Sequence, residues 1–346
     1  LKISVLSRMA RWRRGTLFTS LVAFAFGCFL LRKVRDAGVA PVPKLVFSDI
    51  DGTLAHYEWQ LNGFATVLPG RHKGLATLHY DTGERVDCLA LPSSSSGHAY
   101  ISRWTYSIVE ELRARGLLFV LISGARSTTY LSRRNLLPTA DLEVFEGGGR
   151  IWRSGRPDEE WASLFREFVG VSSDLGSPLP LPEPGNRPGL LWDAFRIMRD
   201  EGWHPDARGY ETAFRLTISL ESADGRNLSF FEEHMLPRLA KQRLGSAINL
   251  GKVDIFPVIS GKANAALHLL RRLDVPPEET AMLFDDENDL DLAKLCGRGF
   301  LPTVTHEQVR LHALEAPNWK VSASRGPLGT EEALEGVLQL LPAATI

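Results

Sequence analysis

The stretch that most constrains this chain is residues 46–53, where a short apolar run is followed by Asp49, Asp51, Gly52 and a threonine. The apolar run predicts a buried β-strand, so the aspartates fall beyond its carboxyl end, where the ligand crevices of open α/β sheets lie. Because alternate residues of an extended chain face opposite ways, both carboxylates reach one site only if the chain turns at once, which Gly52 permits. A solvated turn is the competing interpretation.

Two later stretches repeat this pattern of an apolar run that ends in polar residues. Residues 117–122 lead into Ser123-Gly124-Ala125-Arg126, and residues 280–284 lead into Asp285-Asp286-Glu287-Asn288-Asp289. Helices are predicted over residues 103–115 and from residues 127 and 262 onward. The alternation of strand and helix predicts a parallel sheet with right-handed crossovers, whose carboxyl edge brings these polar groups together.

This edge of the predicted sheet would carry the carboxylates of Asp49, Asp51, Asp285 and Asp289. Such carboxylates repel one another unless a cation lies among them. Oxygen ligands without a cysteine or histidine cluster suit magnesium. With the Lys262 ammonium and the Ser123 hydroxyl nearby, the residues predict a Mg²⁺–carboxylate site that receives a phosphate group. A solvated lysine and a helix-capping serine are the alternative interpretations.

The pattern changes after residue 150, where helical spacing of apolar residues is mixed with an alternating strand at residues 214–220. Helices are predicted near residues 161–168, 191–198 and 230–239, and further strands near 247–250 and 253–256. Such a mixture suggests a separate α+β unit over residues 152–254, inserted into the first domain. Trp161 and Phe165 are interpreted as core residues. Residues 203–210, with Asp206, Arg208 and Tyr210, form a polar-aromatic loop. Two interpretations stay open: the loop recognises the leaving group of a substrate, or it is a loop that binds no ligand.

Taken in chain order, these stretches resemble the motifs of the haloacid dehalogenase-like (HAD) hydrolase superfamily. The quoted residues are Asp49-Ile50-Asp51-Gly52-Thr53, Ser123-Gly124-Ala125-Arg126, Lys262 and Asp285-Asp286-Glu287-Asn288-Asp289. The inserted unit, residues 253–257 and residues 326–330 are similar to the type IIB branch, which contains Cof-like and sucrose-phosphatase-like proteins. The resemblance spans about residues 44–341. It implies a Rossmann-like core at residues 44–151 and 255–346 and a C2-type cap at residues 152–254.

The resemblance also implies a role for each motif residue. Asp49 would be the nucleophile that forms an aspartyl-phosphate, and Asp51 the general acid and base. Mg²⁺ would be held by Asp49, Asp285 and the main-chain carbonyl of Asp51. Asp289 would orient these ligands, and Asn288 is a further candidate for that role. Ser123, Gly124 and Lys262 would bind the phosphate.

The implied activity is that of a phosphatase acting on a small phosphorylated metabolite, with a sugar phosphate expected from the type of cap. A phosphomutase is the closest alternative, and a retired, membrane-tethered binding protein is an alternative of another class. Phe284 and Gly147 depart from the branch, which usually has glycine at the first position and asparagine at the second. Ala263 follows Lys262, where the branch often has glycine. Phe284 is expected to crowd the metal loop. Arg126 suits a substrate contact or a structural ion pair equally.

Residues 1–43 differ in composition from the rest of the chain. The apolar residues 15–31 lie between arginine-rich flanks, which predicts a membrane-anchoring helix or a cleaved mitochondrial or plastid targeting peptide, with a buried core helix as the alternative. Eight of the 40 basic residues precede the first acid, Asp36, so the remaining 32 face 41 acids and give a charge of −9. The body is therefore acidic, and nucleic acid is not an expected partner.

Residues 56–102 form a further insertion directly after the first motif. The apolar segments 75–80 and 85–91 flank Asp81-Thr82-Gly83-Glu84, a turn sequence that predicts a β-hairpin. Residues 93–96 with Gly97 predict a flexible loop. The hairpin is interpreted as a flap beside the first strand, and a surface insertion without function is the alternative.

Overall fold

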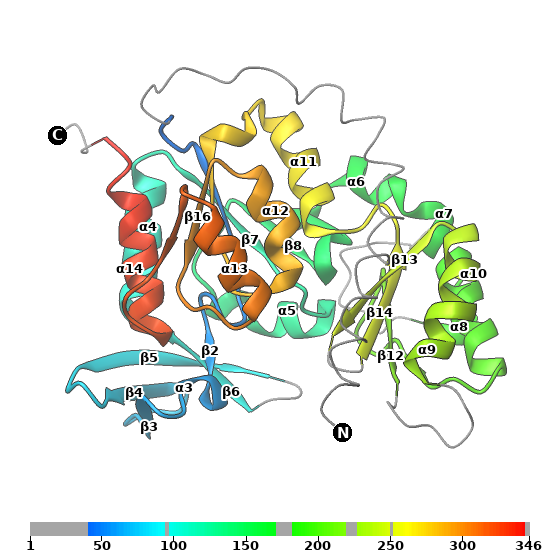
Figure 1. Ribbon diagram of the computed structural model, residues 1–346, viewed down its shortest axis with the longest axis horizontal. Coiled ribbons are helices and arrows are strands. Elements are labelled where there is room, and N and C mark those ends of the chain that lie inside the picture. The colour runs from blue at the N-terminus through cyan, green and yellow to red at the C-terminus, as the bar shows by residue number, and fades with distance from the viewer. Residues whose placement is uncertain (1–40, 94–96, 171–181, 219–226, 250–251, 343–346) are drawn as a thin grey trace, which may run out of the picture. The chain divides into compact units, whose positions relative to one another are not determined.

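The computed structural model describes residues 41–93, 97–170, 182–218, 227–249 and 252–342 (Figure 1). The apolar segment at residues 15–31 lies outside these ranges, so its predicted role stays a prediction. In the described part of the chain, no helix is both long enough and apolar enough to cross a membrane.

The central sheet has the strand order β10-β9-β8-β7-β1-β15-β16-β17. The six strands β8, β7, β1, β15, β16 and β17 run parallel. β9 and β10 extend the sheet antiparallel beside β8. Val46 of β1 lies opposite Phe119 of β7 and Ala281 of β15. The bounds are β1 Leu45–Ser48, β7 Leu118–Ile122, β8 Leu142–Phe145, β9 Arg150–Arg153, β10 Arg156–Pro157, β15 Thr280–Leu283, β16 Arg298–Leu301 and β17 Trp319–Val321. The predicted parallel sheet is confirmed.

Both faces of β1 are buried, which explains why its sequence is apolar without alternation. Leu45 and Phe47 pack into one core with helices α11 and α12, whereas Val46 packs into a second core with α4 and α14. These helices span α4 Arg103–Ala114, α11 Lys262–Leu273, α12 Leu290–Leu295 and α14 Gly326–Leu338. Helices α5 Ser127–Arg133 and α13 Glu307–Glu315 complete this part. β17 was not predicted because its side chains are half-buried or exposed and form no apolar run.

A separate antiparallel sheet, in the order β11-β12-β14-β13, lies within and just beyond the predicted inserted unit. Its strands are β11 Pro205–Asp206, β12 Phe214–Thr217, β13 Leu244–Asn249 and β14 Lys252–Pro257. The helices in the same part of the chain are α6 Glu159–Leu164, α7 Arg166–Val169, α8 Leu190–Asp200, α9 Leu228–Phe230, the π-helix Phe231–Met235 and α10 Leu236–Lys241. Phe214 and Leu216 are buried, as the alternation predicts. The predicted C-terminal end of this strand, residues 219–220, lies outside the described residues.

The helical spacing expected over residues 161–168 is interrupted. Trp161 and Phe165 are core residues as predicted, but Leu164 is 49% exposed. Helix α6 ends at Leu164, and a new helix begins at Arg166. A single continuous helix would have placed Leu164 on the inner face, so that prediction was wrong.

The insertion at residues 56–102 forms its own antiparallel sheet in the order β2-β6-β5-β4-β3. The elements are β2 His56–Tyr57, α3 Glu58–Leu61, β3 Ala65–Pro69, β4 Leu75–Tyr80, β5 Arg85–Pro92 and β6 His98–Ser102. The predicted hairpin is β4–β5, and Gly83 at its turn has φ +102°. The insertion is larger than the predicted hairpin. Strands β2, β3 and β6 were not predicted, because their sequences show only weak alternation of apolar and polar residues. Leu78, Val86 and Tyr100 form the sheet's own small core.

A buried chain of hydrogen bonds joins this insertion to the last helix. The Thr330 hydroxyl of α14 donates to the carbonyl of Thr53 at 2.5 Å, and His56 Nε2 lies 2.8 Å from Thr330 Oγ1. A hydroxyl has one proton, so His56 Nε2 must be the donor in the second bond. Burial lowers the pKa of His56 from 6.5 to about 3, so the ring is neutral in the folded protein.

This histidine predicts a pH dependence of stability. Because the folded-state pKa is depressed, the unfolded state binds the extra proton below about pH 6.5, and stability falls with pH from there toward pH 3. His56→Gln keeps an amide donor but cannot titrate. We expect the pH slope of its unfolding free energy between pH 6 and 4 to be smaller by roughly 1.4 kcal/mol per unit. Urea titrations of His56→Gln and of the exposed control His72→Gln measure this, and equal slopes would refute it.

Candidate active site

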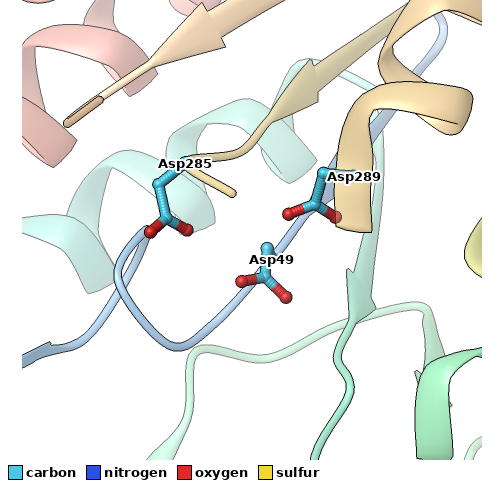
Figure 2. Close-up of side chains that lie close together, drawn as sticks. All are labelled: Asp49, Asp285 and Asp289. Atoms are coloured by element: carbon cyan, nitrogen blue, oxygen red, sulfur yellow. The ribbon is translucent and has the colours of Figure 1, made fainter. Parts of the chain in front are cut away.

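Three aspartates meet at the carboxyl edge of the central sheet. Figure 2 shows the side chains of Asp49, Asp285 and Asp289 close together, and one carboxylate oxygen of each lies within 4.8 Å of the others. Asp49 directly follows β1, Asp285 lies just beyond β15, and Asp289 ends the short 3₁₀ turn Glu287–Asp289. All three are buried. The parallel order of β1 and β15 therefore brings together residues more than 230 positions apart in the sequence.

Lys262 supplies the positive charge of this cluster. Its Nζ donates to Asp49 Oδ1 and to Asp289 Oδ1, both at 2.7 Å, and the lysine is buried. Lys262 is the first residue of α11. The alternative interpretation of this residue as a solvated lysine is excluded by its burial.

The charges of the cluster do not balance. Burial, with repulsion from Asp289 and Asp51, raises the pKa of Asp49 to about 7 despite the opposing Lys262. Burial, with repulsion from Asp49 and Asp289, raises the pKa of Asp285 well above its usual range. Within the described residues, Asp289 Oδ2 is buried without a hydrogen-bond partner. Carboxylates in excess over ammonium, with an unpaired buried oxygen, fit a hard divalent cation.

The turn after β1 places its residues against the Asp285 carboxylate. Thr53 Oγ1 donates to Asp285 Oδ1 at 2.8 Å. Gly52 has φ +90°, and a Cβ at this position would overlap the Asp285 carboxylate. Glycine is thus required here for two reasons: the left-handed backbone and the close approach of Asp285.

Asp51 lies apart from the buried aspartates. Its side chain is 30% exposed, and its Oδ1 accepts hydrogen bonds from Tyr57 Oη at 2.8 Å and from Arg133 Nη1 at 2.7 Å. Neither donor was predicted from the sequence, since no motif marks a tyrosine of the insertion or an arginine at the end of α5.

The other predicted ligands are placed less directly. Ser123 is buried at the end of β7, and its Oγ accepts from the Ala125 amide at 3.0 Å, which fixes the loop that contains Gly124. Ser123 caps this turn rather than a helix. Asn288 is exposed and donates to Asp286 Oδ2 at 3.0 Å, so its amide is engaged outside the cluster of buried aspartates.

The two departures from the family pattern have a structural account. The Phe284 ring packs edge-on against Trp319, with ring centroids 4.9 Å apart, and joins the core on that side of the sheet. The expectation that Phe284 crowds the metal loop was wrong, because successive residues of an extended chain face opposite ways. Gly147 has φ +61° and ψ +28°, a conformation that asparagine also adopts readily.

Arg126 and Glu146 are among the side chains that connect this edge of the core to the inserted unit. Arg126 pairs with Asp206 at 3.1 Å, donates to the Arg208 carbonyl at 2.9 Å and lies over the Tyr210 ring. Glu146, which no motif marks, is buried and accepts from the amides of Ser127, Glu211 and Thr212 at 2.7–3.2 Å. Of the two roles considered for Arg126, the ion pair is formed, and it involves the predicted polar-aromatic loop.

Comparison with known proteins supports the fold. No protein-family model and no curated protein matches this sequence. Solved structures do match: the sucrose-phosphatase of Synechocystis sp. PCC6803, at 15% identity over 86% of this chain and 98% of that one, has a TM-score of 0.52. BT1666 of Bacteroides thetaiotaomicron, a HAD-superfamily phosphatase, is 12% identical over 88% of this chain and 100% of its own, with a TM-score of 0.52.

A third similar structure, protein 0175 of Thermoplasma acidophilum, is 12% identical over 87% of this chain and 100% of its own, with a TM-score of 0.53. At these identities the likeness concerns the fold, and the fold is the one that the sequence motifs predict. The chain therefore has the fold of the haloacid dehalogenase-like phosphatases, with the motif residues Asp49, Lys262, Asp285 and Asp289 joined in one buried cluster at the carboxyl edge of its sheet.

Proposed function

We propose that this protein is a Mg²⁺-dependent phosphatase that hydrolyses a small phosphorylated metabolite through an aspartyl-phosphate. The observation that carries the proposal is the buried cluster of Asp49, Asp285 and Asp289 around Lys262. Strongly perturbed carboxylates that converge at the edge of an α/β sheet are typical of catalytic sites. The similarity to HAD phosphatases supports the same reaction class.

The proposed reaction has two steps. In the first, an Asp49 carboxylate oxygen attacks phosphorus, the bond from phosphorus to the leaving oxygen breaks, and Asp51 gives its proton to that oxygen. In the second, Asp51 takes a proton from water, the water oxygen attacks phosphorus, and the bond to Asp49 breaks. Lys262 holds Asp49 in place and, with Ser123 and the Gly124 loop, is proposed to bind phosphate oxygens.

Asp49, Asp285 and the main-chain carbonyl of Asp51 are proposed to hold the metal, with Asp289 orienting the cluster. When bound, Mg²⁺ would neutralise these carboxylates and polarise a phosphate oxygen.

We further propose that the unit at residues 152–254 acts as a C2-type cap and selects the substrate. The Arg208 side chain is 88% exposed on the loop that Arg126 ties to the core. A sugar phosphate is the favoured substrate class, by analogy with the sucrose-phosphatase structure, which was solved with sucrose and phosphate.

Replacement of the nucleophile tests the reaction. Asp49→Asn keeps the shape of the side chain but cannot form the phosphoenzyme, so we expect phosphate release to fall by roughly a thousandfold or more. The measurement is phosphate release from 4-nitrophenyl phosphate and a panel of sugar phosphates, with magnesium or chelator. Asp291→Asn, an exposed aspartate outside the cluster, should retain activity. Activity that survives in Asp49→Asn would contradict the proposal.

The close approach of Gly52 gives a second prediction. Gly52→Ala places a methyl group against Asp285, so we expect kcat/KM to fall on the order of a hundredfold through a displaced carboxylate. Gly63→Ala is the matched control: Gly63 has φ +84°, and no heavy atom lies within 4 Å of a Cβ there. Equal losses in the two variants would show that backbone strain alone is responsible.

Metal binding should stabilise the protein in a pH-dependent way. The folded-state pKa of Asp49 is raised to about 7 in the metal-free protein, so below pH 7 a proton occupies the carboxylate and competes with Mg²⁺. At one magnesium concentration we expect the thermal midpoint to rise by on the order of a few degrees at pH 8 and by less at pH 6. Asp285→Asn should abolish the rise and Asp291→Asn should not. A rise that is larger at pH 6 would contradict the assignment.

A further inference from the structure

The insertion at residues 56–102 contacts the general acid of the proposed reaction. Tyr57, on strand β2, donates its phenol proton to Asp51 Oδ1 at 2.8 Å. Burial and the neighbouring Asp51 carboxylate raise the pKa of Tyr57, so the phenol keeps the proton that it donates. Strand β2 is held in the inserted sheet by pairing Tyr57 with Ala99 of β6. The position of the Asp51 carboxylate therefore depends on the sheet that carries Tyr57.

Arg133 connects the same carboxylate to a second point of the insertion. Its guanidinium donates to Asp51 Oδ1 at 2.7 Å, to Tyr57 Oη at 2.9 Å and to the carbonyl of Pro92 at the end of β5. Arg133 is the last residue of α5 and is 1% exposed. A buried guanidinium with several fixed acceptors has little freedom, so it holds the carboxylate in one orientation.

Both donors bind the same oxygen of Asp51. Tyr57 and Arg133 bond to Oδ1, whereas Oδ2 accepts no hydrogen bond from the part of the chain that the structure describes. The side chain is 30% exposed, which leaves Oδ2 accessible to a substrate. An anchored oxygen and a free one are what a general acid needs, since the free oxygen carries the proton to the leaving group.

We propose that Tyr57 and Arg133 are positioning residues that hold Asp51 with Oδ2 toward the leaving group, and that this is the function of the inserted sheet. The inference rests on the proposed phosphatase reaction. In the first step the proton passes from Asp51 Oδ2 to the leaving oxygen as its bond to phosphorus breaks. In the second step Oδ2 takes a proton from the attacking water, which restores the acid.

Dependence on the leaving group distinguishes this role from a structural one. 4-Nitrophenolate leaves readily without a proton, phenolate less readily, and ethoxide requires one. The rate constant kcat/KM reports the first chemical step. For Tyr57→Phe and Arg133→Met, we expect kcat/KM to fall roughly tenfold to a hundredfold for ethyl phosphate, by less for phenyl phosphate, and least for 4-nitrophenyl phosphate. Arg133→Lys, which keeps a cation, should recover part of the loss.

Matched controls come from the same elements. Arg134→Met removes the adjacent arginine, whose ion pair is with Glu143, and Tyr80→Phe removes a phenol of the inserted sheet that bonds to the Arg325 carbonyl. Both should leave the three kcat/KM values in their wild-type ratio. If Arg133→Met fails to fold by circular dichroism, Tyr57→Phe decides the question, because it keeps the ring and removes a single hydroxyl.

The outcomes separate this inference from the proposed function. Equal losses for all three substrates, or no loss, in Tyr57→Phe and Arg133→Met would overturn the positioning role while the Asp49-dependent activity of the wild type stands. A wild type that shows no Asp49-dependent hydrolysis of 4-nitrophenyl phosphate would overturn the proposed function and this inference with it. A loss that grows from 4-nitrophenyl to ethyl phosphate would support the role.

Discussion

The buried contact of Lys262 with Asp49 and Asp289 is the interaction on which the site depends. Burial of charge is unfavourable, and removal of one partner from a buried ion pair typically costs about 3–5 kcal/mol because the other charge is left uncompensated. Lys262 begins α11, Asp49 follows β1 and Asp289 precedes α12, so this contact also fixes how three elements of the core meet. The excess negative charge that remains is what makes the cluster suitable for a divalent cation.

The backbone around the cluster is shaped to allow this close approach. Gly52 lets Asp285 lie against the turn after β1, and Gly148, at φ +99°, lies so close to the Gly261 carbonyl that a side chain would overlap it. The second contact joins the end of β8 to the residue before Lys262. Two glycines thus bring the loops that follow different strands into contact, and both act through the absence of a Cβ rather than through a polar group.

Two additions to the core contact loops at the carboxyl edge of its sheet. The inserted sheet after the first motif reaches Asp51 through Tyr57, and Arg133 ties both to α5. The unit at residues 152–254 reaches the loop after β7 through Arg126, and Glu146 accepts amide hydrogen bonds from both sides of that connection. The inserted sheet and the unit at residues 152–254 are therefore each joined to loops of the core by ion pairs and hydrogen bonds.

The sequence alone determined the parallel sheet and the buried aspartates, because apolar runs that end in polar residues report local burial and strand direction. It also predicted the β4–β5 hairpin, which glycine and short-range alternation specify. It did not reveal Tyr57, Arg133 or Glu146, since their partners are distant in the chain and no local pattern marks a buried hydrogen bond. Only the tertiary structure decided those contacts, because they depend on which segments pack together, and packing is set by the whole core rather than by neighbouring residues.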